Sequence, residues 1–312
     1  MAKFKAKKTG LTFTTLFIAV VAAAIAITLS SHGIISGVPT WSDILGAPSE
    51  NVPTVAVNDN SVYFVDCGQG DCSALISGDS VAVIDSGPGS KKYETVEKLK
   101  NLGITTVNML ILTHPHEDHI GGAAEIMNEF AVESVYMVEP SESNTPTTKV
   151  YENTLQAIVN EGITITQPEI DGTVQCGDFT LKFLSPRKDY DDHNNNSIVL
   201  RADVDGKSFL FTGDAENAPE RDLIKKCKYD LDCDVLKVGH HGSSTSTSEE
   251  FYNSITPEIA VISCGEGNDY GHPHGETLKL LQNADVYRTD LNGTVAVSIE
   301  DGKLSVSTEK QG

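Results

Sequence analysis

A layered α/β or α+β fold, preceded by a helix that spans a membrane, is the architecture that the sequence predicts. From about residue 57 to the end, short apolar runs typical of strands alternate with stretches of helical periodicity. Helices that alternate with strands in this way cover the faces of a sheet. Residues 11–29 carry no charge, and 39% of the 312 residues are hydrophobic, which suffices for a sizeable core.

The start of the chain has the features of a membrane anchor. Residues 1–10 form a basic segment with four lysines, Lys3, Lys5, Lys7 and Lys8, and the apolar run 11–29 that follows is about as long as one bilayer crossing. We expect a single-pass anchor in the cell membrane, with residues 1–10 inside and the remainder outside. The alternative is a signal segment that is cleaved, which would release the protein.

One domain is expected after a linker. Residues 30–56 are rich in Ser, Gly, Pro and Asn and show no sustained periodicity, which is typical of a spacer. Residues 57–312 are expected to form the domain. Its candidate strands are 62–65, 81–84, 109–112, 209–211, 235–238 and 259–262. Its candidate helices are 93–102, 122–130, 147–161, 248–255 and 275–283.

Charge and cysteine content limit the function classes. The formal net charge of the chain is −21, and the four lysines are the only charged residues among residues 1–29. Residues 30–312 are therefore more acidic than the chain as a whole. Such a field disfavours avid binding of nucleic acid unless a basic patch or a bound metal offsets it. Six cysteines in an oxidising location allow a disulfide, for which Cys227 and Cys233 are the nearest pair. We favour small buried thiols instead, because most lie in apolar stretches.

The segment MLILTHPHEDHIGG, residues 109–122, carries the chemistry. An apolar strand ends there, and three histidines and two acids follow within six positions. His114 and His116 can direct two imidazoles at one ion, while Asp118 and His119 can supply an oxygen and a nitrogen to a second. The glycines at 121 and 122 are expected to let the chain turn tightly before the next helix. The pattern predicts a metal site.

The motif H-x-H-x-D-H after an apolar strand resembles that of the metallo-β-lactamase superfamily. This resemblance implies a four-layer αββα sandwich with two metals between its sheets. Asp85 in VAVIDSG resembles the acid of the family that supports the metal loop without ligating. Asp214 in FLFTGDA resembles the acid that bridges the two metals.

Two later segments supply the remaining histidines that the resemblance implies. In DVLKVGHHGS, residues 234–243, His241 is expected to ligate the second metal, and His240 to donate a proton or contact the substrate. His193 in DDHNNNSIVL lies four residues before a serine that opens a strand, which matches the H-x-x-x-S placement of the family. Ligation by His193 and a solvated loop histidine are equally compatible with this pattern.

A narrower resemblance extends over nearly all of residues 60–300. It is carried by YFVDCGQGDCSALI, THPHEDHIGG, NNNSIVL, FTGDAE, DVLKVGHHGS, SCGEGNDYGHPH and VYRTDLNG. These stretches are similar to the C-terminal metallo-β-lactamase domain of ComEC competence proteins and their stand-alone relatives. The chain departs from that family by having one apolar span in place of many, so it cannot itself form a DNA channel. Where the family often has Asp in the metal loop, His116 should favour zinc.

The resemblance implies an extracytoplasmic hydrolase. Two divalent ions, zinc or alternatively manganese, would lie about 3.5 to 4 Å apart and hold a bridging hydroxide that attacks the substrate. Asp118, His240 and His272 are the expected catalytic residues, and Tyr270 and His274 the expected substrate contacts. No protein partner can be inferred.

The expected substrate is a phosphodiester, in DNA or in another extracellular phosphate ester. One alternative is a hydrolase of cell-wall phosphate esters of the phosphorylcholine type, which an acidic surface tolerates better than duplex DNA. Lactam hydrolysis is disfavoured, because the motifs resemble the ComEC type. A catalytically silent binding module is disfavoured as well, because every ligand type is retained.

Overall fold

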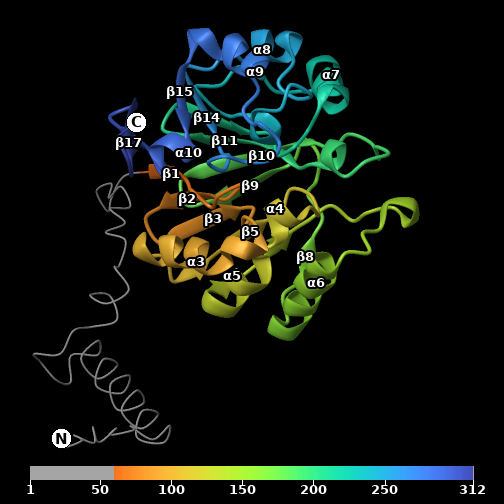
Figure 1. The fold of residues 1–312 in the computed structure, drawn as a ribbon. Helices are drawn as coiled ribbons and strands as arrows, with labels where there is room; N and C mark the ends of the chain where they lie inside the picture. The colour runs from red at the N-terminus through yellow and green to blue at the C-terminus, as the bar shows by residue number, and fades with distance from the viewer. Residues whose placement is uncertain (1–59, 312) are drawn as a thin grey trace, which may run out of the picture. The chain divides into compact units, whose positions relative to one another are not determined.

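Two β-sheets packed face to face form the centre of residues 60–311, the part of the chain that the computed structural model describes (Figure 1). The predicted basic segment, membrane anchor and linker, and the first residues of the predicted domain, lie outside the described residues. Between residues 60 and 311, no helix is long and apolar enough to cross a membrane.

The first sheet has eight strands and is built from both ends of the described chain. Its order is β17-β16-β1-β2-β3-β5-β7-β8. The strands are β1 (Asn60–Phe64), β2 (Ser73–Ser77), β3 (Ser80–Ile84), β5 (Met109–Ile111), β7 (Val135–Tyr136), β8 (Ile165–Thr166), β16 (Val295–Glu300) and β17 (Lys303–Thr308). The C-terminal hairpin β16–β17 joins the sheet because β16 pairs antiparallel with β1.

The second sheet has seven strands in the order β15-β14-β13-β12-β11-β10-β9, so strands that are neighbours in the sheet are also consecutive along the chain. They are β9 (Thr173–Cys176), β10 (Phe179–Ser185), β11 (Val199–Val204), β12 (Lys207–Phe211), β13 (Val235–Lys237), β14 (Ile259–Ile262) and β15 (Asp285–Arg288). The pairs from β12 to β15 are parallel. A small separate pair joins β4 (Thr106–Val107) to β6 (Ala131–Val132).

Helices cover the outer face of each sheet. In Figure 1, α3, α5 and α6 lie below the first sheet, and α7, α8 and α9 lie above the second. The helices are α3 (Lys92–Asn101), α4 (Glu117–Ile120), α5 (Ala123–Glu129), α6 (Lys149–Glu161), α7 (Asn217–Lys226), α8 (Glu249–Ile255), α9 (Gly275–Leu280) and α10 (Thr289–Asn292). The four-layer αββα sandwich that the resemblance implied is therefore confirmed.

Alternating side chains of the strands build the core between and outside the sheets. Along β1, Val62 and Phe64 pack into the cluster between the two sheets, while Tyr63 packs into the cluster under α3, α5 and α6. In β12, Phe209 and Phe211 face the first sheet, and Leu210 faces the helices. Because both faces of these strands are buried, they appear in the sequence as continuous apolar runs.

All six candidate strands and all five candidate helices are present, with ends shifted by a few residues. Helix α7 was missed. Its sequence NAPERDLIKK buries only Pro219, Glu220 and Leu223, so its apolar periodicity is weak. Among the strands that were missed, β2, β10, β11 and β16 have apolar patterns that serines and charged residues interrupt, and β4, β6, β7 and β8 are only two residues long.

The cysteines are free thiols, and five of the six are buried. The disulfide considered for Cys227 and Cys233 is absent, so that possibility was wrong. The preferred interpretation of small buried residues is confirmed for all but Cys227, which is half-buried.

The glycines that follow the histidine motif serve close packing. Gly121 and Gly122 have φ of −60° and −91°, which other residues adopt readily. A Cβ atom on Gly121 would lie 2.2 Å from the nitrogen of Gly89, and one on Gly122 would lie 2.4 Å from the carbonyl oxygen of Ser86. The two glycines therefore let the segment after α4 approach the loop after β3. Close packing of these two segments, and not the tight turn that was expected, is what requires glycine at these positions.

We predict that Gly121→Ala lowers the free energy of unfolding by about 1 to 3 kcal/mol, because the added methyl group forces two backbone segments apart. Gly275→Ala is the matched control, since that glycine opens α9 and nothing lies within 4 Å of its added Cβ. It should change stability by less than about 1 kcal/mol, in the stabilising direction. Urea-induced unfolding followed by circular dichroism measures both, and equal effects would contradict the packing explanation.

Candidate metal centre

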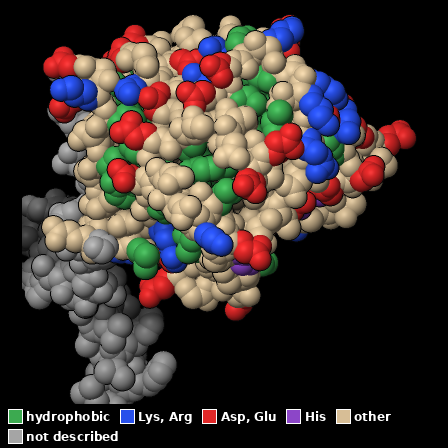
Figure 2. All heavy atoms as spheres, turned by 90° about the horizontal axis from the view of Figure 1, so that it is seen from above, with side chains coloured by type: hydrophobic (Ala, Val, Ile, Leu, Met, Phe, Trp, Pro, Cys, Tyr) green, Lys and Arg blue, Asp and Glu red, His purple; other side chains and the backbone are tan. Residues whose placement is uncertain are grey.

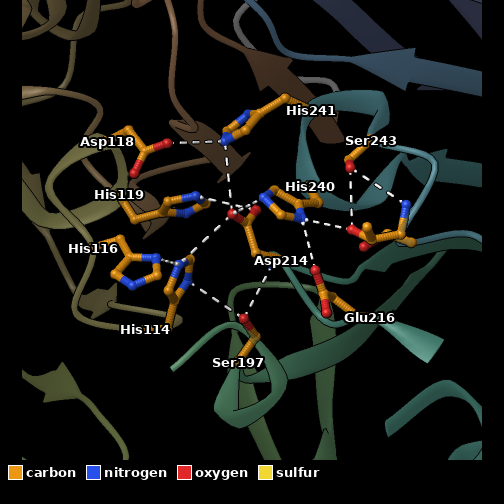
Figure 3. A network of polar contacts seen from close by, with 12 residues as sticks. His114, His116, Asp118, His119, Ser197, Asp214, Glu216, His240, His241 and Ser243 are labelled. Atoms are coloured by element: carbon orange, nitrogen blue, oxygen red, sulfur yellow. Dashed lines mark hydrogen bonds and ion pairs between the residues drawn. The ribbon is translucent and has the colours of Figure 1, made fainter. Parts of the chain in front are cut away.

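A cluster of histidines and aspartates lies where loops of the two sheets meet (Figure 3). His114, His116, Asp118 and His119 lie on the segment between β5 and α5. Asp214 lies between β12 and α7, and His240 and His241 lie directly after β13. Because β5, β12 and β13 all run in parallel pairs, their carboxyl ends deliver these side chains to one edge of the sandwich.

One group of potential ligands joins His114, His116 and Asp214. One ligand atom of each lies within 4.8 Å of the others. The Nε2 atom of His114 lies 3.1 Å from Nδ1 of His116 and 3.7 Å from Oδ2 of Asp214. The side chain of His114 is completely buried. Two imidazoles and one carboxylate thus face a common point.

A second group joins Asp118, His119, Asp214 and His241 by the same criterion. Oδ1 of Asp214 lies 3.2 Å from Nε2 of His119, and Oδ2 of Asp118 lies 3.1 Å from Nε2 of His241. Asp214 is common to both groups, so its carboxylate lies between them (Figure 3).

Neighbouring polar groups fix the orientation of these histidines. Asp85 has φ 59° and accepts hydrogen bonds from the backbone nitrogen and the hydroxyl of Thr113, both at 2.8 Å. Its Oδ2 atom also lies 2.8 Å from Nδ1 of His119, so Nε2 of that ring is directed at Asp214. The hydroxyl of Ser197 lies 3.3 Å from Nδ1 of His114 and accepts a hydrogen bond from the Asp214 nitrogen.

Burial controls the protonation of the first group. It lowers the pKa of His114 well below its ordinary value, and the nearby His119 adds to this effect. Burial lowers the pKa of His116 as well. Both imidazoles are therefore neutral at neutral pH, which is the form that binds a metal ion.

In the second group, the charges of nearby carboxylates outweigh the effect of burial on the pKa of the histidine. Burial alone would lower the pKa of His241, but Asp214, Asp71 and Asp118 outweigh it and raise that pKa to about 10. Burial alone would raise the pKa of Asp214, but the charges of His119 and His241 hold it well below its ordinary value. The group therefore keeps buried negative charge that requires cationic partners.

Two buried atoms of this cluster have unused bonding capacity. Nε2 of His119 and Oδ1 of Asp214 form an ion pair at 3.2 Å, and neither atom makes a hydrogen bond to any residue of 60–311. Buried polar atoms without partners are costly and uncommon. A divalent cation would coordinate both atoms, so the residues present fit a metal ion.

His193 lies beside the first group and outside it. Its ring centroid lies 5.6 Å from that of His116, and the side chain is half-buried. It belongs to neither of the two groups of potential ligands.

His240 has a backbone conformation that directs its ring toward the cluster. Its φ and ψ of 50° and 47° lie in the left-handed region. Its Nδ1 atom lies 3.2 Å from the hydroxyl of Thr245 and 3.4 Å from Oε1 of Glu216, and its Nε2 atom lies 3.6 Å from Asp214. Glu216 was not among the predicted site residues, and its one signal in the sequence is its position two residues after Asp214.

The expected substrate contacts lie on one loop before α9. The ring of Tyr270, which is 68% exposed, stacks on His272 at 5.6 Å, and His272 lies 5.7 Å from the ring of His240. Burial, followed by the charges of His241 and His240, lowers the pKa of His272 to about 4. His274 accepts a hydrogen bond from the Ser244 nitrogen and lies beside His272.

An open groove passes over the cluster. Its lining residues include Gln69, Glu117, Asp118, Asp214, His240, His241, Tyr270 and His272. Among the described residues that line the groove, there is no Lys or Arg. Any positive charge along it must therefore come from a bound cation or from protonated histidines.

The chain is similar in sequence to competence proteins. The chain is 39% identical over 196 residues to ComE operon protein 3 of Bacillus subtilis, with 62% of this chain and 25% of that protein covered. It is 30% identical to Competence protein ComA of Neisseria gonorrhoeae, with 85% and 36% covered. The chain thus spans between a quarter and two fifths of the length of these relatives.

Solved structures agree on the fold. CmlA, a diiron beta-hydroxylase from Streptomyces venezuelae, superposes with a TM-score of 0.54 at 13% identity, with 88% of this chain and 63% of that chain covered. YhfI of Bacillus subtilis, a metallo-beta-lactamase fold protein, gives 0.51 at 13% identity, with 76% and 99% covered.

The family model of the metallo-beta-lactamase superfamily matches residues 65–266. This range contains every residue of the two groups of potential ligands. The resemblance to competence proteins is confirmed by the relatives. The fold, the cluster of His and Asp residues and the sequence match agree, and the chain belongs to the metallo-beta-lactamase superfamily.

Proposed function

We propose that this chain is an extracytoplasmic phosphodiesterase whose site holds two divalent metal ions. The observation that carries the proposal is the position of Asp214, whose carboxylate is common to both groups of potential ligands. A carboxylate shared in this way suits a site for two ions.

The ligands of the proposed site follow from the two groups. His114, His116 and Asp214 would hold one ion, and Asp118, His119, Asp214 and His241 the other. Four imidazoles among the six ligand residues favour zinc, and manganese is the alternative. Bound divalent ions supply Lewis-acid activation of water at neutral pH and neutralise charge at the attacked phosphorus.

The histidines over the groove would act on the substrate. Nδ1 of His240 is held by Thr245 and Glu216, and its Nε2 atom faces Asp214 at 3.6 Å, a position from which it would donate a proton to the leaving oxygen. His272 has a pKa of about 4 and is therefore neutral at neutral pH. It would contact phosphate oxygens as a hydrogen-bond donor without adding charge, and Tyr270 extends this surface.

The charge of the groove favours a small ester over a long polyanion. A protein that binds a nucleic-acid strand neutralises several phosphates with Lys or Arg, and the described lining of the groove has neither. Exposed cations lie instead on α7, at Arg221, Lys225 and Lys226, and Figure 2 shows Lys and Arg gathered at one edge of the molecule. DNA is the alternative that the resemblance to ComEC competence proteins implies, so substrate length is the property to measure.

We predict that the purified domain binds about two zinc or manganese ions per chain after reconstitution. Asp118→Ala should reduce the content to about one, because Asp118 belongs to the second group alone. Elemental analysis after gel filtration measures this.

His193→Ala provides the control for the site. Full metal content in this variant would remove His193 from the ligands, and a reduced content would add it as a seventh. A wild-type domain that stays metal-free would contradict the two-ion centre.

We predict that the metal-loaded domain hydrolyses bis-p-nitrophenyl phosphate faster than single-stranded DNA, a phosphorylcholine ester or nitrocefin. The reason is that the groove offers neutral donors and metal-binding residues but no Lys or Arg along its described lining. Preference for the phosphorylcholine ester would favour a cell-wall hydrolase, turnover of nitrocefin alone would contradict the phosphodiester assignment, and no turnover at all would favour a binding module.

His240→Ala separates catalysis from metal binding in the same assay. Turnover should fall by roughly 10² to 10⁴, the usual contribution of an acid-base group, while both metal ions stay bound. Loss of a metal ion in this variant would make His240 a ligand instead.

The extracytoplasmic location rests on residues 1–29, where lysines precede the apolar run. We predict that protease added to intact cells digests the domain. Protection until the cells are lysed would place the domain inside.

A further inference from the structure

The loop between β1 and β2 carries a Gln-Gly-Asp sequence, residues 69–71, none of which belongs to the two groups of the proposed two-ion site. Asp71 on this loop forms an ion pair with Lys237, the last residue of β13, at 2.8 Å. The two side chains are only 6% and 3% exposed. The pair therefore joins the first sheet to the second in the interior, directly below the cluster of potential ligands.

Packing alone does not account for this pair. Removing two charges from water is costly, and apolar side chains of similar size often replace a buried ion pair without loss of stability. Lys237 has a second partner, since its ammonium donates a hydrogen bond to the carbonyl oxygen of Val238 at 3.0 Å. Lys237 is thus fixed at the point where the strand passes into the His240–His241 turn.

Asp71 contacts both members of one ligand pair. Its backbone nitrogen donates a hydrogen bond to the carbonyl oxygen of Asp118 at 3.1 Å. Its Oδ1 atom lies 3.3 Å from Nδ1 of His241, an electrostatic contact, while that nitrogen also lies 3.0 Å from the carbonyl oxygen of Ser263. Asp118 and His241 come from segments 123 residues apart, and Asp71 is in contact with each.

The preceding glycine makes this approach possible. A Cβ atom on Gly70 would lie 2.3 Å from the carbonyl oxygen of Asp118, and its φ of 155° is one that side chains rarely adopt. The loop is therefore shaped to lie against the backbone of Asp118. Asp85 contacts His119 as Asp71 contacts His241: in each case the carboxylate faces the Nδ1 atom of the ring, and for Asp85 and His119 the distance is 2.8 Å.

We propose that Asp71, held by Lys237, is a positioning residue that aligns Asp118 and His241 so that both can bind one divalent ion. Asp71 lies with Asp85 and His119 in a further group whose ligand atoms are within 4.8 Å of one another, but it belongs to neither group of the proposed two-ion site. Its role would be to fix the Asp118 backbone and the His241 ring, whose ligand atoms lie 3.1 Å apart. This inference rests on the proposed two-ion site. It assigns a function to the Gln-Gly-Asp loop, which otherwise has none.

Zinc titration of the soluble domain against a chromophoric chelator tests the proposal. Asp71→Asn should weaken binding of the second zinc ion by about 10- to 100-fold and leave the first unchanged, as expected for the loss of a group that orients a ligand. The double variant Asp71→Asn/Lys237→Met leaves no unpaired buried charge, so it should fold and show the same loss. The matched control is Glu309→Gln, because Glu309 forms a buried ion pair with Lys98 and belongs to neither ligand group.

The possible results distinguish a positioning role of Asp71 from a purely structural ion pair. Zinc affinities within about twofold of wild type in the double variant, or failure of both Asp71 variants to fold, would overturn the proposal and leave a structural ion pair. An equal loss of the second zinc ion in Glu309→Gln would overturn it as well. A wild-type domain that binds fewer than two zinc ions would instead contradict the proposed site, and this inference with it.

Discussion

The buried carboxylate of Asp214 is the constraint on which the rest of the site depends. It is 2% exposed, and its Oδ1 atom makes no hydrogen bond within the described part of the chain. A negative charge in such a place is stable only among cationic partners. His119 and His241 supply positive charge to it, and Asp85 and Asp71 orient those two rings from behind. The surrounding loops are arranged around this one charge.

The sandwich makes the arrangement possible because each sheet contributes half of it. His114 to His119 follow the end of a strand in the first sheet, and Asp214 and His241 follow strands of the second. Their relative position therefore depends on how the two sheets pack, through side chains such as Phe64 and Phe211, whose rings stack at 5.9 Å. Core packing and site geometry are linked by this interface.

The sequence sufficed to predict what local spacing encodes. His114, His116, Asp118 and His119 lie within six positions of one another after an apolar strand, and the structure brings them together with Asp214 and His241. Contacts across the sheets left no such signal. Asp71, Ser197 and Glu216 lie in or next to recognisable motifs, but those motifs do not show that their side chains contact His241, His114 and His240, which are remote in sequence. The packing role of Gly121 was not predicted for the same reason, because the backbone that it approaches is that of Gly89, which is remote in sequence.

The pairing of β16 with β1 has a consequence for when the first sheet can be completed during synthesis of the chain. The first sheet contains residues 60–64 and residues 295–308, so the pairing of β1 with β16 waits for the last part of the described chain to leave the ribosome. Until then β1 presents an unpaired edge, which is prone to association with other strands. Addition of β16 and β17 to the sheet is therefore a long-range step, and the edge of β1 stays open to other strands until it occurs.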